Sequence, residues 1–114
     1  MVILKRGRFS DISTMVTETG ISKADGILFD LGTSMFHLKT PERGFSFLSE
    51  ELLDMRMDIR QSLTAGNVVN KYPEKEIDRI LWEYGEERLS RKIAKAIINY
   101  RNKKKIETCA ELSD

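Results

Sequence analysis

Residues 25–32 read Asp-Gly-Ile-Leu-Phe-Asp-Leu-Gly, a short apolar run between two glycine turns with an acid where the run stops. Apolar runs of this length, bounded by glycine, are typical of strands buried on both faces of a parallel sheet. We therefore predict a strand at Ile27–Phe29 with Asp30 at its carboxyl end. In open α/β sheets ligands bind at that edge, because the loops that leave it diverge and form a crevice.

The residues before this run predict the rest of a partial α/β unit. Ser10 or Asp11 can cap a helix that ends at Gly20, and Val2–Leu4 has the composition of a strand stub. A sheet with so few strands exposes unpaired edges. We expect such a unit either to stay mobile or to pair its edges with another copy, forming a homo-oligomer.

The stretch from residue 33 to residue 62 has no sustained apolar period. In it, residues 41–46 read Pro-Glu-Arg-Gly-Phe-Ser and residues 53–58 read Leu-Asp-Met-Arg-Met-Asp. An irregular stretch of this length is usually a functional loop or a disordered one. Its aromatic residues favour the functional loop; they are Phe36, Phe45 and Phe47.

The second half of the chain predicts helices with short connections. Thr64 can cap a first helix, Pro73 can open a second, and a last helix begins near Thr108. The clearest helix covers residues 86–102 and has an apolar stripe of residues spaced by three and four, which are Leu89, Ile93, Ala96, Ile97 and Tyr100. Trp82 and Tyr84 fall on the apolar face of the preceding helix, which favours the core over base stacking.

Composition and charge exclude several classes of protein. Of the 114 residues, 40% are hydrophobic and 32% are charged, with 19 basic and 18 acidic side chains, so the total charge does not indicate a nucleic-acid binder. One cysteine and one histidine cannot form an internal disulfide or a Cys/His zinc cluster, which fits a reducing cytoplasm. No run is long and apolar enough for a signal peptide or a membrane span.

The distribution of charge is more informative than its total. No acid lies between Leu89 and Ile106, whereas the helix carries many lysines and arginines. A basic face of this kind is often only solvated. Because the opposite face is apolar, the helix is expected to dock and to present a cationic surface, which suits an RNA backbone. We name Arg91, Lys92 and Lys95 as candidate RNA-binding residues.

Four motifs resemble those of the MraW-type family of S-adenosylmethionine-dependent methyltransferases. They are the segments 25–32, 41–46 and 53–58 quoted above and the Tyr-Gly-Glu-Glu-Arg of residues 84–88, in the order of the family. The resemblance runs from about Phe9 to the last residue. It implies the fold class: a fragment of a Rossmann-like α/β methyltransferase domain in residues 1–62, followed in residues 63–114 by part of an all-helical substrate-recognition insert, mostly α in this chain.

The resemblance also implies a reaction. Members of the family transfer a methyl group from S-adenosylmethionine to the N4 amine of a cytosine in bacterial 16S rRNA, so the implied partner is 16S rRNA or the small ribosomal subunit. The Gly-rich cofactor turn that ends in Gly-Gly-His and the last strands of the family do not occur in these residues, and we expect the fragment alone to be inactive. The alternative is a truncated, non-catalytic helical module that binds RNA or protein.

By resemblance, the catalytic residue is Asp30, and the cofactor-binding residues are Phe9, Asp30 and His37. The residues themselves leave alternatives open: Asp30 can be a turn cap, and Phe9 a core anchor before a helix. His37 stands where the family has glutamine, and imidazole can replace one amide hydrogen bond but not both when charged.

Arg43 and Arg56 are candidate RNA-binding residues, because a guanidinium presents a planar fork to phosphate. Both are flanked by acids, so the alternative is salt bridging inside the loop. Methyl transfer to an aromatic amine needs no metal, and we predict no metal site, although Asp54 and Asp58 at a spacing of four are a weak signal for one.

Overall fold

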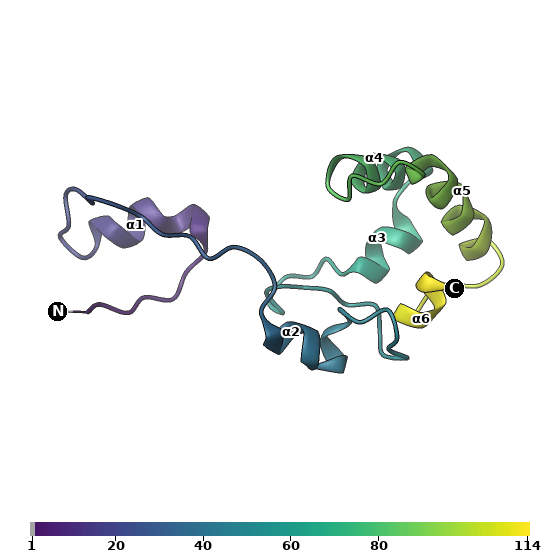
Figure 1. The fold of residues 1–114 in the computed structure, drawn as a ribbon, viewed down its shortest axis with the longest axis horizontal. Helices are drawn as coiled ribbons and strands as arrows, with labels where there is room; N and C mark the ends of the chain where they lie inside the picture. Colours follow the sequence, from purple (N-terminus) through teal and green to yellow (C-terminus); the bar gives the residue numbers. More distant parts are fainter. Residues whose placement is uncertain (1) are drawn as a thin grey trace. The chain divides into compact units, whose positions relative to one another are not determined.

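The computed structural model describes residues 2–114, whose regular secondary structure is helical (Figure 1). The chain divides into two units, Met1–Leu31 and Gly32–Asp114. Regular β-strands are absent from the described residues, which hold only an isolated antiparallel bridge between Leu52 and Thr108. None of the helices in residues 2–114 has the length and apolar character to span a bilayer.

The first unit confirms its helix but not its strands. A 3₁₀ turn, η1 (Phe9–Asp11), leads into α1 (Ile12–Thr17), and the chain turns at Gly20 with φ of 75°. The strand predicted at Ile27–Phe29 and the stub at Val2–Leu4 are wrong for these residues, because neither segment has a hydrogen-bonded neighbour and Leu28 is 95% exposed. Without strand edges here, a Rossmann-like sheet and edge-paired copies stay predictions.

The second unit begins with short helical pieces inside the stretch that the sequence leaves without a period. They are α2 (Met35–Lys39) and η2 (Pro41–Arg43), and the chain from residue 44 to residue 64 is irregular. Gly44 follows η2 with φ of 68°, a left-handed conformation that glycine adopts without strain. A Cβ atom at Gly44 would lie 2.6 Å from the Leu52 carbonyl oxygen and 2.7 Å from the Asp54 nitrogen. Glycine is therefore required where the two motif segments meet.

Two of the helices that follow begin at capping boxes. α3 (Ala65–Lys71) starts after Thr64, whose hydroxyl accepts the Asn67 N–H at 3.1 Å, and α6 (Cys109–Ser113) starts after Thr108, whose hydroxyl accepts the Glu111 N–H at 3.2 Å. Each box satisfies backbone donors that the first turn leaves unpaired. The predicted caps at Thr64 and Thr108 are confirmed.

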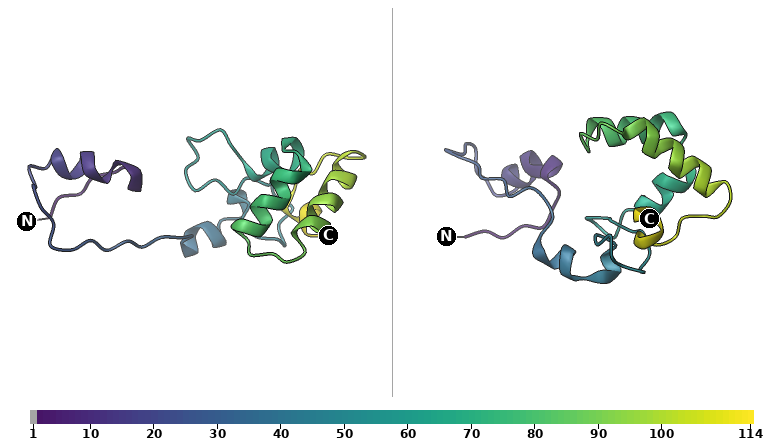
Figure 2. Two further views of the ribbon diagram at one scale, coloured as in Figure 1. Left: turned by 90° about the horizontal axis from the view of Figure 1, so that it is seen from above. Right: turned by 45° about the vertical axis from the view of Figure 1, so that its right-hand side comes forward.

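The two longest helices form the centre of this unit. α4 (Glu74–Glu83) and α5 (Ser90–Arg101) pack against each other, as both views in Figure 2 show. Pro73 is the cap of α4 rather than its first residue, and α5 begins later than predicted because Glu86 takes a φ of 51° in the connection.

The core lies in the second unit and is small. Its buried apolar residues are Leu53, Val69, Ile77, Ala94, Ile97, Ile106 and Cys109. On α5 the fully buried residue is Ala94, whereas Leu89 is 55% exposed and Tyr100 42% exposed, so the predicted stripe is partly wrong. The core prediction for Trp82 and Tyr84 is also wrong, since they are 59% and 74% exposed.

Leu53 connects the loop to both ends of the helical unit. Its N–H donates to the Glu107 carbonyl at 2.9 Å, its carbonyl accepts the Gly66 N–H at 2.8 Å, and its side chain is buried. The neighbouring Asp54 carbonyl accepts the Ala65 N–H at 2.8 Å. The irregular loop is thus fixed by backbone pairing to the start of α3 and to the segment before α6.

Asn70 makes a second long-range connection. Its amide nitrogen donates to the carbonyls of Gly66 (2.8 Å) and Ile106 (2.7 Å), and its side-chain oxygen accepts the Ile106 N–H at 3.0 Å. Ile106 is 2% exposed, so its backbone groups have little access to water. The Asn70 amide replaces that water and holds the chain after α5 against α3.

Leu53→Ala is expected to destabilise the second unit by about 2–5 kcal/mol, since it leaves a cavity in a buried site. Urea unfolding followed by circular dichroism measures the change. Leu52→Ala is the matched control: the same substitution one residue earlier, at a side chain that is 68% exposed, should cost less than about 0.5 kcal/mol. Equal losses of stability in the two variants would contradict the role given to Leu53.

Candidate functional site

Asp30 and Phe9 both lie in the first unit and are open to solvent. The Phe9 ring meets the Phe29 ring edge to face, with centroids 5.8 Å apart and planes at 76°, so the aromatic pair adjoins Asp30 along the chain. Asp30 has no hydrogen bond or ion pair within residues 2–114. An exposed carboxylate beside aromatic faces can accept hydrogen bonds from an amine or an ammonium group. In this geometry Asp30 is not a turn cap, and Phe9 is not a buried core anchor.

His37 lies in the second unit, where it caps α2. Its Nδ1 accepts the Ser34 N–H at 3.1 Å and lies 2.9 Å from the Ser34 hydroxyl oxygen. The ring also meets Phe45 edge to face at 5.5 Å. With Nδ1 used for capping, Nε2 is the nitrogen that remains for a ligand. His37 can therefore offer a ligand one of the hydrogen bonds that the family's glutamine would offer at this position.

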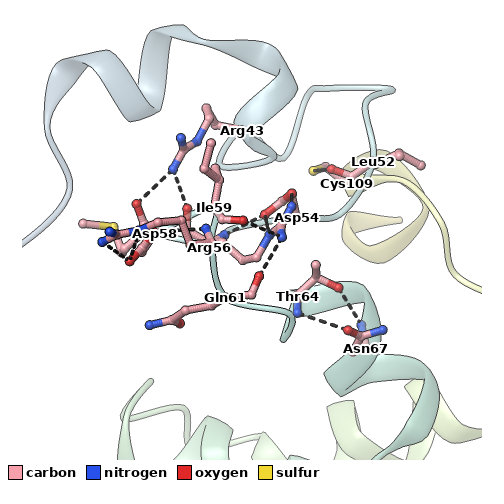
Figure 3. A network of polar contacts seen from close by, with 12 residues as sticks. Arg43, Leu52, Asp54, Arg56, Asp58, Ile59, Gln61, Thr64, Asn67 and Cys109 are labelled. Carbon is pink, nitrogen blue, oxygen red and sulfur yellow. Dashed lines mark hydrogen bonds and ion pairs between the residues drawn. The ribbon is translucent and has the colours of Figure 1, made fainter.

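Arg56 holds the 53–58 motif together (Figure 3). Its Nε and Nη2 donate to the two carboxylate oxygens of Asp54 at 2.8 and 2.7 Å, and its Nη1 donates to the carbonyls of Ile59 and Gln61 at 3.0 and 2.7 Å. The hydrogen bond from the Arg56 side chain lowers the pKa of Asp54, so the pair stays ionised at neutral pH. Since all three guanidinium nitrogens are engaged, the internal role describes Arg56.

Arg43 connects the two motifs of the loop. Its Nη2 donates to the carbonyls of Arg56 and Met57, at 2.5 and 3.1 Å, while the Met55 N–H donates to the Arg43 carbonyl at 3.0 Å. Figure 3 shows this guanidinium pointing toward the Arg56 segment. The structure thus brings the two predicted arginines together, but as parts of a folded loop. RNA contact by either stays a prediction.

The two acids of the 53–58 motif are paired with arginines. Asp58 accepts from Nε and Nη2 of Arg60 at 2.8 and 2.7 Å, as Asp54 does from Arg56. Residues 2–114 contain no group of three or more His, Cys, Asp or Glu side chains that could hold a metal ion.

Two groups can be distinguished among the basic residues of the second unit. Arg101 is half-buried and donates to the carbonyls of Val69 and Tyr72 at 2.8 and 2.7 Å, which closes the end of α3. Lys104 pairs with Glu111, and this contact lowers the pKa of Glu111 to about 2. Lys105 pairs with Glu107 at 2.9 Å. These cations therefore serve the fold.

The second group is open to solvent, and we call it the basic ridge: Arg88, Arg91, Lys92 and Lys95. All four are exposed, and none makes an ion pair or a side-chain hydrogen bond within residues 2–114. Arg88 precedes α5, and the other three lie in its first two turns. Three of the four are the residues predicted from the sequence. Arg88 is a further member of the same charge run.

The chain is similar to known proteins over almost its whole length. Residues 1–114 match the model of the MraW methylase family. The chain is 55% identical over 106 residues to the protein named ribosomal RNA small subunit methyltransferase H of Caldicellulosiruptor saccharolyticus, covering 93% of the chain and 34% of that relative. It is 54% identical to the protein of the same name from Persephonella marina, covering 96% of the chain and 37% of the relative.

The identity extends to a further bacterium, Neorickettsia sennetsu, whose protein of that name is 53% identical over 108 residues. The chain spans about a third of the length of these relatives, since it covers 34% to 37% of them. The match includes both units and all four motifs. On this similarity the chain belongs to the MraW methylase family.

Proposed function

We propose that this chain is the central part of a cytoplasmic, S-adenosylmethionine-dependent methyltransferase that modifies the N4 amine of a cytosine in 16S rRNA. The observation that supports this most is the match, over 93% and 96% of the chain, to relatives named ribosomal RNA small subunit methyltransferase H. In this proposal residues 1–62 belong to the cofactor-binding domain, and residues 63–114 belong to the insert that contacts RNA.

Each unit has open side chains that would suit a cationic cofactor or an amine substrate. In the first unit, Asp30 offers an exposed carboxylate and Phe9 an exposed ring face. In the second unit, His37 offers Nε2. When bound, the cofactor supplies an electrophilic sulfonium methyl group. We assign Phe9 and His37 to cofactor contact, each within its own unit.

Asp30 is proposed to act on the nucleophile. Its carboxylate accepts a hydrogen bond from the cytosine amine, which orients the nitrogen lone pair toward the methyl group. As the nitrogen forms its new bond to carbon it acquires positive charge, and the carboxylate stabilises that charge and accepts the proton that leaves. No metal and no covalent intermediate are needed for this step.

The second candidate is a non-catalytic helical module that binds RNA or protein. It is favoured by one observation: every buried residue among residues 2–114 lies in the second unit. The basic ridge would serve RNA binding in the methyltransferase and in an RNA-binding module alike. The two differ in whether Asp30 matters for methyl transfer.

Asp30→Asn in the complete protein should reduce methyl transfer at least about 100-fold, because the neutral amide cannot accept a proton. Transfer of a labelled methyl group from S-adenosylmethionine to small ribosomal subunits measures the rate, and circular dichroism checks the fold. Asp25→Asn is the control, an exposed acid at the other end of the same motif, and should keep the normal rate. Near-normal turnover in the Asp30 variant would remove the catalytic role.

Replacing Arg91, Lys92 and Lys95 together with Gln should weaken RNA binding and reduce its salt dependence. The slope of log affinity against log salt should fall by roughly 0.7–0.9 for each phosphate that the protein no longer neutralises. Fluorescence anisotropy of labelled RNA over a salt series gives both quantities.

The control for this variant changes the net charge equally. Lys103, Lys104 and Lys105 are replaced with Gln, two of which are already paired with Glu111 and Glu107. Its affinity and slope should change less than those of the ridge variant. Equal reductions in affinity would show that only total charge matters, and an unchanged ridge variant would mean that this face is merely solvated.

A further inference from the structure

A groove lies between α4 and the start of α5, and Trp82 forms part of its wall. The cavity measures about 450 Å³ and is lined by Lys75, Asp78, Arg79, Trp82, Arg88 and Arg91, among others. Trp82 is the only tryptophan in the chain, and it is 59% exposed. An indole left this open forgoes much of the burial that aromatic side chains gain in a core. It is therefore free to contact a ligand.

One of the cations in the groove is fixed and the others are open. Arg79 donates to Glu76 and Glu83, at 3.0 and 2.7 Å, and its guanidinium carbon lies 6.0 Å from the centre of the Tyr84 ring. These contacts hold Arg79 as a rigid part of the wall. Lys75, Arg88 and Arg91 have no ion pair within residues 2–114. The groove thus combines an exposed indole with unpaired positive charge.

We propose that this groove binds one nucleotide of single-stranded RNA, with its base stacked on Trp82 and its phosphates at Arg88 and Arg91. This inference rests on the proposed function and adds a base-contacting residue to the basic ridge. Aromatic platforms inside cationic grooves hold single strands because every base offers a π-face and every linkage a negative charge. Paired RNA hides those faces in its stack, so a duplex should not use Trp82.

The positive charge of the groove disfavours binding of an apolar partner, and the exposed Trp82 indole disfavours binding of an acidic protein. An apolar segment would leave three unpaired cations to be desolvated, which is unfavourable. Acidic side chains would pair with those cations but would leave the Trp82 face without a planar partner. A nucleotide satisfies both features.

Asp78 gives the groove a means of base preference. It lines the cavity, is half-buried and has no ion pair within residues 2–114, whereas Glu76 is occupied by Arg79. A carboxylate accepts hydrogen bonds from the exocyclic amine of cytosine but finds no donor of that kind on uracil. We therefore expect the groove to bind oligocytidylate more tightly than oligouridylate.

Tryptophan fluorescence of the 114-residue chain tests the stacking directly, because the signal comes from Trp82 alone. Titration with a short oligocytidylate should quench it. Inorganic polyphosphate, polyglutamate and duplex RNA should leave it nearly unchanged at the same charge concentration. Equal quenching by polyphosphate or polyglutamate would overturn the nucleotide, and the polyglutamate result would indicate an acidic protein instead. Absence of quenching by oligocytidylate would overturn the site.

Variants measure the contribution to affinity with labelled oligocytidylate. Trp82→Ala should weaken binding roughly 5- to 150-fold, the range found for removing one base–aromatic stack, and Trp82→Phe should restore much of it. Tyr100→Ala is the matched control, since Tyr100 is 42% exposed near the end of α5 and does not line the groove. An equally large reduction in Tyr100→Ala, or none in Trp82→Ala, would contradict the proposal. Equal binding of oligouridylate would remove the role of Asp78.

Failure of this inference can be separated from failure of the proposed function. The complete protein carrying Trp82→Ala is assayed for methyl transfer beside the Asp30→Asn variant. If Asp30→Asn is inactive while Trp82→Ala binds RNA and turns over normally, the function stands and the Trp82 site is wrong. If Trp82→Ala raises KM for the small subunit and leaves kcat unchanged, the groove is a binding subsite as proposed.

Discussion

The backbone of Leu53 is the constraint on which the second unit depends. Its N–H and carbonyl pair with two segments that are far apart in the sequence, the chain before α6 and the first turn of α3, while its side chain fills the core between them. A loop without regular structure can be fixed in this way, because each buried backbone group must find a partner. Gly44 allows the second motif to approach, since no side chain fits between it and Leu52.

The cations of the second unit differ in whether the fold uses them. Where the loop closes, Arg43 and Arg56 donate to carbonyls and to Asp54, and where α5 ends, Arg101 donates to the last carbonyls of α3. A guanidinium held by several hydrogen bonds is costly to recruit for another ligand, because each bond would have to be replaced. The side chains of the basic ridge make no hydrogen bond or ion pair within residues 2–114. They are therefore positive charges that the fold does not use and that a ligand can bind without breaking existing contacts.

The packing of α4 on α5 also determines which large side chains stay exposed. Ala94 is fully buried on α5, and its small side chain lets a neighbouring helix approach. The larger residues Trp82, Leu89 and Tyr100 remain exposed, outside the core that Ala94 helps to form. A groove with an indole and open cations at its rim follows from that arrangement. The same contact that builds the core thus creates the surface on which the RNA proposal rests.

The sequence by itself determined what depends on a few neighbouring residues: the caps at Thr64 and Thr108, the turn at Gly20, the run of basic residues and the four motifs of the family. Tertiary structure decided that no strand forms at Ile27–Phe29, that Trp82 is exposed and that the Arg56 guanidinium bonds to groups of its own loop. Capping joins residues three apart, so the local sequence specifies it. Burial and strand pairing depend on segments such as Leu53 and Glu107, whose meeting no local pattern encodes.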